Sequence, residues 1–217
     1  MADLRENDER ILLGVTGGIA SGKTTVARML EKMGAPVIDF DLLSRTVVEP
    51  GKPAWREIVS FFGEQVLLPD KTLDRKRLSE IVFRDAEKRK KLEGFTHPRI
   101  HQEFVRLVRE HTAGDRKAII QAVIPLLIEN NLQSLFHKLL LVYIPPDKQV
   151  ERLMARDRVP RETAQRILAA QWPIDEKKAY ADYIVDNSGT PEDTERQVRE
   201  IWAKLKEFQK SRGSEPR

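Results

Sequence analysis

The 217-residue sequence contains no cysteine, no long apolar run, no internal repeat and no low-complexity linker. Without cysteine the chain forms no disulfide, no zinc–thiolate site and no thiol nucleophile. The longest apolar runs, such as residues 139–144, are far shorter than the roughly 20 residues needed to span a bilayer. The first ten residues are polar and lack the apolar segment of a secretory signal. These absences predict a cytoplasmic protein without membrane contact.

What the sequence does contain fits a globular protein with a heavily charged surface. Hydrophobic residues make up 40% of the chain and charged residues 33%. The formal net charge of +4 suits anionic small molecules as well as nucleic acid, and therefore does not choose between them. The length predicts one domain, or one domain that carries an inserted lobe.

Short apolar runs alternate with helical patterns along most of the chain. Continuous rather than alternating apolar residues predict strands that are covered on both faces, as in a parallel sheet. Strands followed by helices indicate a doubly wound α/β fold with about five parallel strands. The predicted strands are 10–16, 35–40, 117–124, 138–144 and 181–186, and the predicted helices between or after them include 23–33, 146–157 and 191–210.

Two segments interrupt this alternation. Residues 53–111 show helical patterns without a clear strand, and residues 157–180 form a second charged, helical stretch. We interpret the first as an inserted helical lobe and the second as a mobile lid. The nucleotide-binding core then comprises residues 1–52 and 112–217. The alternative is that both segments are ordinary crossovers with solvated faces.

A glycine-rich segment joins the first predicted strand to the first predicted helix, and it fits the pattern G-x-x-x-x-G-K-[ST]. Glycines let the backbone wrap closely around phosphates, and the helix N-terminus adds a positive dipole at the same place. Lys23 is expected to reach the β- and γ-phosphates, and the Thr24 hydroxyl to bind Mg²⁺. The segment therefore predicts a nucleoside triphosphate site formed by Gly17, Gly18, Ile19, Ala20, Ser21, Gly22, Lys23, Thr24 and Thr25.

Two aspartates follow the second predicted strand, at the sheet edge where α/β proteins bind ligands. If the strand continues through Asp39 and Asp41, the two carboxylates share a direction. One can then hold Mg²⁺ through water while the other accepts a proton from an acceptor hydroxyl. The alternative is that Asp41 caps the helix that begins at Leu42, and both roles could coexist.

Arginines on the predicted helix 146–157 supply cations for a phosphate. Arg152 and Arg156 are four residues apart and therefore share a helical face. The planar guanidinium donates two hydrogen bonds to phosphate oxygens, so Arg156 is positioned to clamp the transferring group. The alternative is a surface arginine that pairs with Glu151 or Asp157.

Other phosphate-loop classes lack their own signatures in this chain. No guanine-reading Asn-Lys-x-Asp follows a strand, and the third predicted strand ends without the paired acids of nucleic-acid motors. A small-molecule kinase is therefore favoured. A nucleotide switch or a nucleic-acid remodelling protein stays open as the alternative from another class, and salt-dependent nucleic-acid binding would reveal it.

Several motifs, in this order, resemble the dephospho-coenzyme A kinase family over about residues 10–190. The resemblance implies transfer of the γ-phosphoryl of ATP, with Mg²⁺, to the ribose 3′-hydroxyl of dephospho-coenzyme A, the last step of coenzyme A synthesis. The rivals are other phosphate-loop kinases, for shikimate, gluconate or a nucleoside monophosphate. The motifs are TGGIASGKTTVA (16–27), VIDFDLLSR (37–45), VVEPG (47–51), THPRI (96–100), IPLLIEN (124–130), RLMARD (152–157), ILAAQ (167–171) and YIVDNSG (183–189).

The resemblance also implies roles for individual residues. Asp41 is the base or hydroxyl-orienting group, Asp39 organises the magnesium shell, and Arg45 holds the acceptor. Lobe 53–111 is the coenzyme-binding domain. On the acceptor side the implied contacts are His97, Pro98, Leu127 and Glu129; Arg156 is the lid arginine, and Asn187 and Gly189 lie in the loop that cradles adenine.

The sequence departs from the family pattern at three positions. Ala20 stands where glycine is common, and its methyl is tolerable if the backbone there is not left-handed. Phe40 replaces a smaller residue between the aspartates, and Val123 replaces a common acid, which leaves the magnesium shell to Thr24 and Asp39.

A protein metal site at the histidines is not expected. Pro98 is predicted to start a helix after His97, so His97 and His101 need not share a face. No acidic residue stands at metal-site spacing from them. We expect no nucleic-acid partner, and a monomer or weak homo-oligomer.

Overall fold

The computed structural model describes residues 9–213. A five-stranded sheet has the order β2-β3-β1-β4-β5, in which β1 pairs in parallel with β3 and β4, and β4 pairs in parallel with β5. The predicted doubly wound α/β fold is confirmed, and each strand lies within or next to its predicted range. The strands are β1 (Ile11–Gly17), β2 (Val37–Asp39), β3 (Ile119–Val123), β4 (Lys138–Tyr143) and β5 (Tyr183–Asp186).

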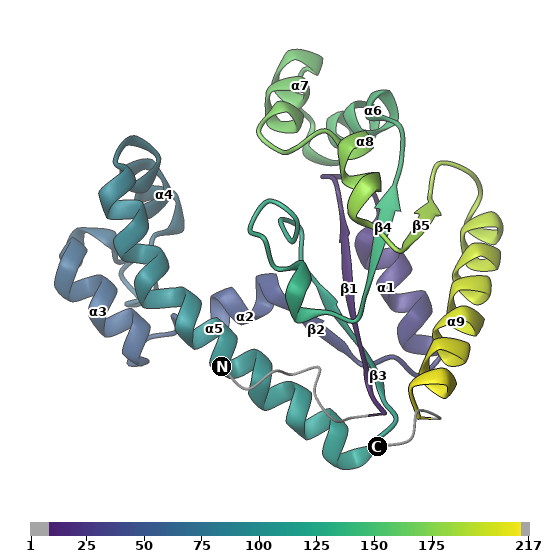
Figure 1. The fold of residues 1–217 in the computed structure, drawn as a ribbon. Coiled ribbons are helices and arrows are strands. Elements are labelled where there is room, and N and C mark those ends of the chain that lie inside the picture. The colour runs from purple at the N-terminus through teal and green to yellow at the C-terminus, as the bar shows by residue number, and fades with distance from the viewer. Residues whose placement is uncertain (1–8, 214–217) are drawn as a thin grey trace. The chain divides into compact units, whose positions relative to one another are not determined.

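Residues 9–38 and 110–213 form one compact unit, which contains most of the sheet. Its helices α1 (Lys23–Lys32) and α9 (Pro191–Gly213) contact each other beside the strands (Figure 1). Helices α6 (Pro146–Asp157), α7 (Arg161–Ala169) and α8 (Ile174–Lys177) lie beyond the end at which β1 and β4 finish. The carboxyl ends of the central strands therefore face the phosphate loop and the predicted lid, which both belong to this unit.

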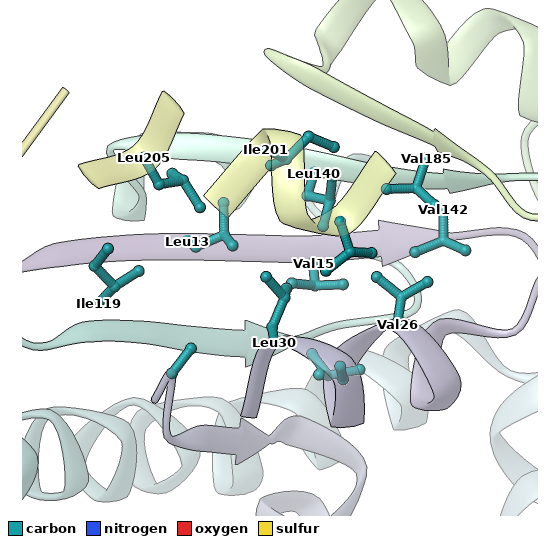
Figure 2. Packing of buried hydrophobic residues seen from close by; sticks show 14 of the residues in the cluster. Leu13, Val15, Val26, Leu30, Ile119, Leu140, Val142, Val185, Ile201 and Leu205 are labelled. Carbon is teal, nitrogen blue, oxygen red and sulfur yellow. The ribbon is translucent and has the colours of Figure 1, made fainter. Parts of the chain in front are cut away.

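The period of two along β1 explains why the sheet is covered on both faces. Leu13 and Val15 point toward α1 and α9, where they meet Leu30 and Ile201 in a fully apolar cluster (Figure 2). Gly14 points to the other face, where a side chain would meet Leu127, Leu139 and Phe136. Each residue of β1 is thus buried on one face or the other, as its continuous apolar run predicts.

Residues Asp39–Arg109 form the second compact unit. The predicted lobe 53–111 lies mostly within it, but the unit already begins at the end of β2. Its own core is built from residues including Val48, Ile58 and Leu78. Its helices are α2 (Phe40–Thr46), α3 (Pro53–Phe62), α4 (Arg75–Arg84) and most of α5 (Ala86–Gly114), with a short 3₁₀ turn at Glu64–Val66.

The first unit also contains two 3₁₀ turns, at Gln133–Leu135 and Lys178–Tyr180. Within residues 9–213, no helix combines the length and the apolar character that crossing a membrane requires.

Candidate functional site

The glycine-rich segment forms a tight turn between β1 and α1. Gly17, Ala20 and Gly22 all have positive φ angles, of 157°, 57° and 90°. The N–H groups of Thr25 and Val26 both donate to the Gly22 carbonyl, which closes the first turn of α1. Alternation of left-handed and ordinary conformations turns successive N–H groups inward, and this concavity binds anions. The geometry is that of a phosphate-binding loop.

Two glycines of this loop are required by side chains that approach from outside it. A Cβ added at Gly18 would collide with the Gln149 amide nitrogen, and one at Gly22 would collide with the Asn187 amide nitrogen. Gly22 also has a left-handed backbone, which favours glycine independently. The loop is therefore shaped by its neighbours as well as by its own sequence.

Alanine at position 20 was expected to be tolerable only if the backbone there is not left-handed, and the structure contradicts that condition. The Ala20 φ of 57° is left-handed, a conformation that costs a residue with a Cβ about 1–2 kcal/mol. The side chain packs beside Val150, Leu153 and Ala164 of the cluster formed by α6 and α7. Packing against α6 and α7 thus stabilises the tip of the loop, where the backbone is strained.

The Lys23 side chain is held by hydrogen bonds within the loop, whereas the Thr24 and Thr25 side chains are not. The Lys23 ammonium donates to the Gly17 and Gly18 carbonyls, each at 2.9 Å. Thr24 and Thr25 are exposed on the first turn of α1, and their hydroxyls have no hydrogen-bond partner among residues 9–213. Lys23 is therefore held at the mouth of the loop, and the Thr24 hydroxyl is available to a ligand.

The loop after β5 is hydrogen-bonded to the phosphate loop. The Asn187 side-chain amide donates to the Ser21 carbonyl at 2.8 Å and accepts from the Thr194 hydroxyl at 2.9 Å. The Arg152 guanidinium donates to the Asn187 carbonyl at 2.8 Å. Gly189 lies close to Asp193, whose carboxylate would be 3.2 Å from an added Cβ. Asn187 thus supports the backbone of the phosphate loop, a contact that its predicted adenine role did not include.

Arg156 and Arg152 do not act as one pair. Arg156 forms a two-point ion pair with Asp157, at 2.7 and 2.9 Å, whereas Arg152 turns toward Asn187. The hydrogen bonds from Arg156 lower the pKa of the Asp157 carboxyl, and Asp157 raises the pKa of Arg156. The structure therefore shows the Asp157 pairing that was the alternative for Arg156, and a phosphate would have to displace it.

Two residues predicted to contact the acceptor are held inside the first unit. Leu127 has no exposed surface and packs under Gly14, so it is a core residue, and the expected acceptor contact is a misreading of its motif. The Glu129 carboxylate lies 2.5 Å from the ammonium of Lys177, whose side chain is fully buried. Neither charged group has another partner within residues 9–213.

Breaking this buried pair is expected to destabilise the fold. Lys177→Met leaves the Glu129 carboxylate buried without a counter-charge, and losing one partner of such a pair costs about 3–5 kcal/mol. For a chain of this size the expected fall in Tm is roughly 10 °C. The double variant Lys177→Met with Glu129→Leu should recover most of that loss. Thermal unfolding of the two variants checks this, and equal losses in both would contradict it.

The structure contradicts two readings of the aspartates after β2: the continued strand, and the alternative in which Asp41 caps the helix. The strand ends at Asp39, and α2 begins at Phe40, so the carboxylates do not share a strand face. Asp39, not Asp41, is the cap: its Oδ1 accepts from the Asp41 and Leu42 N–H groups at 2.8 and 3.2 Å. Asp41 stands in the first turn, exposed, and its carboxylate forms no hydrogen bond or ion pair with the residues that the structure describes.

The helix at the histidines also differs from its prediction. α5 continues through Pro98 instead of starting there, so His97 and His101 are one turn apart on the same helix. The Arg99 side chain donates to the Phe95 carbonyl at 2.8 Å, next to the proline, and also to the Glu57 carboxylate. His97 and Pro98 are exposed. The expectation that a helix begins at Pro98 is wrong. Within residues 9–213, no three histidine, cysteine or acidic side chains gather as a group that could hold a metal ion.

Comparison with known proteins decides which family uses these motifs. The family model described as dephospho-CoA kinase matches residues 11–193. The chain belongs to the dephospho-CoA kinase family. A dephospho-CoA kinase of Geobacter sulfurreducens is 47% identical over 194 residues, which cover 89% of this chain and 98% of that protein. One of Shouchella clausii is 46% identical over 194 residues, 88% of this chain and 97% of that protein.

Solved structures agree with this assignment. A crystal structure from Thermus thermophilus matches with a TM-score of 0.77 and 35% identity, covering 90% of this chain and 98% of that one. A dephospho-CoA kinase from Campylobacter jejuni matches with a TM-score of 0.60 and 29% identity, covering 91% and 98%. The chain is therefore a kinase, and the predicted class of enzyme, a phosphotransferase, is confirmed.

Sequence reasoning missed several residues of this dephospho-CoA kinase family member. Gln149 and Gln171 hold the phosphate loop at Ile19. Gln171 ends the motif ILAAQ, to which no role was assigned, and Gln149 lies in none of the motifs. Arg75 begins α4; burial lowers the pKa of its guanidinium, and the positive charge of Arg45 lowers it further. No acidic partner of either arginine occurs in the part of the chain that the structure describes. A dense run of charges in the lobe hid this pair from sequence analysis.

Proposed function

We propose that the protein transfers the γ-phosphoryl group of ATP to the ribose 3′-hydroxyl of dephospho-coenzyme A, giving ADP and coenzyme A. The observation that carries this proposal is a strand–loop–helix phosphate site in a chain that belongs to the dephospho-CoA kinase family. The acceptor oxygen forms a bond to the γ-phosphorus while the bond from that phosphorus to the β–γ bridging oxygen breaks. The hydroxyl proton passes to a carboxylate.

On the nucleotide side, the phosphate loop holds the triphosphate. Its inward N–H groups and the N-terminus of α1 stabilise the phosphate charge. Lys23 exchanges its two carbonyl partners in the loop for β- and γ-phosphate oxygens. Because phosphoryl transfer depends mainly on positioning and charge stabilisation, we expect removal of the Lys23 charge to lower the rate strongly.

The residues present fit a phosphate-bound magnesium ion rather than a protein metal cage. Mg²⁺ usually keeps several waters and takes only one or two protein oxygens beside the phosphates. The free Thr24 hydroxyl suits a direct ligand, and Asp39 suits a water-mediated one because only its Oδ1 is used in capping. When bound, the ion neutralises charge that develops on the β- and γ-phosphates.

On the acceptor side, Asp41 is proposed as the group that orients the 3′-hydroxyl and accepts its proton. Its exposed, unpartnered carboxylate is suited to that role. Arg45, with Arg75 near it, is proposed to hold the diphosphate of dephospho-coenzyme A, since two arginines without an acidic partner favour a dianion. His97 and Pro98 remain proposed acceptor contacts, and Glu129 acts only by holding Lys177.

Arg156 is proposed to clamp the transferring oxygens after leaving Asp157. The ion pair that it must leave is exposed to solvent, and such pairs contribute little stability. Asn187 and Gly189 are proposed to border the adenine, in addition to the support that Asn187 gives Ser21. A cytoplasmic location, the absence of a nucleic-acid partner and a monomeric or weakly associated state are further proposals.

The experiment that tests this function is ADP release from Mg-ATP with a panel of acceptors. Dephospho-coenzyme A alone should support turnover, whereas shikimate, gluconate and nucleoside monophosphates should not. ATP hydrolysis without acceptor should be slow, since kinases exclude water from the transferring group. Activity only with another acceptor would keep the kinase and discard the substrate.

The arginine pair gives a prediction on substrate affinity. Arg75→Gln should raise KM for dephospho-coenzyme A about tenfold or more, because a charge-assisted hydrogen bond contributes about 1.5–3 kcal/mol. KM for ATP should stay within about twofold, a margin well below the effect of one hydrogen bond. Arg56→Gln is the matched control, an exposed arginine on α3 of the same unit. Steady-state kinetics with each substrate varied checks this, and equal KM values in the two variants would contradict it.

A further inference from the structure

Both backbone polar groups of Ile19, near the tip of the phosphate loop, are held by glutamine side chains. The Ile19 N–H donates to Oε1 of Gln171 at 2.9 Å, and its carbonyl accepts from Nε2 of Gln149 at 2.8 Å. Gln149 is buried on α6, whereas Gln171 follows α7 in the predicted lid. The tip of the loop is therefore fixed by two elements distant in sequence.

The segment from Gln171 to Lys177, which we name the lid stem, is anchored to the nucleotide-binding unit at three points. Gln171 binds Ile19, as described. Ile174 is buried, and its side chain lies 3.3 Å from the Cβ position of Gly18. Lys177 forms the buried ion pair with Glu129. The lid stem therefore has two anchors that do not depend on Gln171.

Apolar contacts join the same part of the loop to α6 and to α7 of the predicted lid. The side chains of Ile19 and Ala20 pack on the cluster of Val150, Leu153 and Ala164 from α6 and α7. This packing fixes the side chains, whereas the glutamines fix the backbone. Gln171 binds the N–H of the Gly18–Ile19 peptide, and Gln149 binds the carbonyl of the Ile19–Ala20 peptide. These two peptide planes lead into the left-handed turn at Ala20, and their orientation determines where the N–H groups of the loop point.

We propose that Gln171 is a positioning residue for phosphoryl transfer, which orients the phosphate loop through the Ile19 N–H. The inference rests on the proposed function for its link to the reaction. Its direct consequence, however, concerns nucleotide binding. A bound triphosphate needs the loop N–H groups already in place, and Gln171 provides that arrangement from the lid. Gln171 therefore links the conformation of the lid to the affinity for the β- and γ-phosphates.

A purely structural role for Gln171 makes a different prediction. The buried Lys177–Glu129 pair and Ile174 hold the lid stem without it, so its loss should not unfold the segment. A positioning role instead predicts a loss that is confined to ligands carrying β- and γ-phosphates. AMP, which lacks both groups, serves as the comparison ligand.

The test compares Gln171→Met, which keeps the side-chain length but removes the amide acceptor, with Gln165→Met. Gln165 is exposed on α7 and its side chain makes no hydrogen bond within residues 9–213, so it is the matched control. Affinity is measured by calorimetric titration with the β,γ-imido analogue of ATP and with AMP. KM for ATP, KM for dephospho-coenzyme A and Tm are measured on the same preparations.

We expect Gln171→Met to weaken binding of the imido analogue about tenfold and to raise KM for ATP equally, the effect of one hydrogen bond. AMP affinity, KM for dephospho-coenzyme A and Tm should match those of Gln165→Met. Unchanged affinity for the analogue, or equal losses for the analogue and AMP, would overturn the proposal. If the unaltered protein binds the analogue but does not phosphorylate dephospho-coenzyme A, the proposed function fails, and the titrations still decide the role of Gln171.

Discussion

Lys23→Ala is expected to lower kcat by about a hundredfold to a thousandfold, the loss measured when one preorganised donor to a developing anion is removed. The ammonium is held at the mouth of the phosphate loop by the Gly17 and Gly18 carbonyls, both at 2.9 Å. The positive charge of Lys23 is thus already held at the loop before the triphosphate binds, so little reorganisation is needed to present it to the γ-phosphate. The loss should therefore fall on the transition state more than on the ground state.

The fold should tolerate this substitution. Lys23 is half-buried, and each neutral acceptor that it leaves costs about 1 kcal/mol. Tm should fall by no more than a few degrees. Lys32→Ala, at the exposed end of the same helix, is the matched control and should remain fully active. ADP release and thermal unfolding measure the two effects, and a fully active Lys23→Ala would remove the proposed nucleotide site.

The elements that sequence analysis located correctly are those whose signals are local. β1 ends in glycines because the phosphate loop needs left-handed backbone, and the apolar run before it must be buried on both faces of the sheet. Pro146 and Pro191 mark the first turns of α6 and α9, where a missing N–H costs nothing. In these places a few adjacent residues contain the whole physical cause.

The incorrect details depend on neighbours that one segment does not specify. Aspartate is a preferred N-cap residue, so the sequence allows either Asp39 or Asp41 to cap the helix after β2. Asp39 is the cap because the strand ends there. A proline inside a helix normally ends or kinks it. α5 nevertheless continues through Pro98, because Phe104 and Val108 in the following part of the helix are buried and Arg99 donates to the Phe95 carbonyl beside the proline. Tertiary packing overrides the local preference in both cases.

The supports of the phosphate loop could not be predicted because they are long-range. Gln149 and Gln171 are 130 and 152 residues from Ile19, and Asn187 is 166 residues from Ser21. Lys177 and Glu129 come from segments that were assigned to a lid and to an acceptor motif. A local motif identifies the residues that contact phosphate. The residues that support the phosphate loop are brought to it by the fold and are distant in sequence.

The acceptor side is tested by Asp41→Asn, which should lower kcat by about a hundredfold to ten-thousandfold, the range for loss of a general base. Asparagine keeps the size and shape of the side chain, but one acceptor oxygen becomes an NH₂ donor that cannot take the hydroxyl proton. The carboxylate is exposed and has no partner in the described chain, so its removal breaks no structural contact. Affinity for the imido analogue of ATP should be retained.

Asp39→Asn separates the proton acceptor from the helix cap. Asparagine caps helices about as well as aspartate, so α2 should persist, because the amide oxygen can accept from the Asp41 and Leu42 N–H groups as the Asp39 carboxylate does. This variant should require more Mg²⁺ for half-maximal rate but keep more turnover than Asp41→Asn. Rates over a magnesium series distinguish the two. If Asp41→Asn turned over normally, Asp41 would be only an acidic first-turn residue that stabilises the helix dipole by about 0.3–1 kcal/mol, and the proton acceptor would have to be another group.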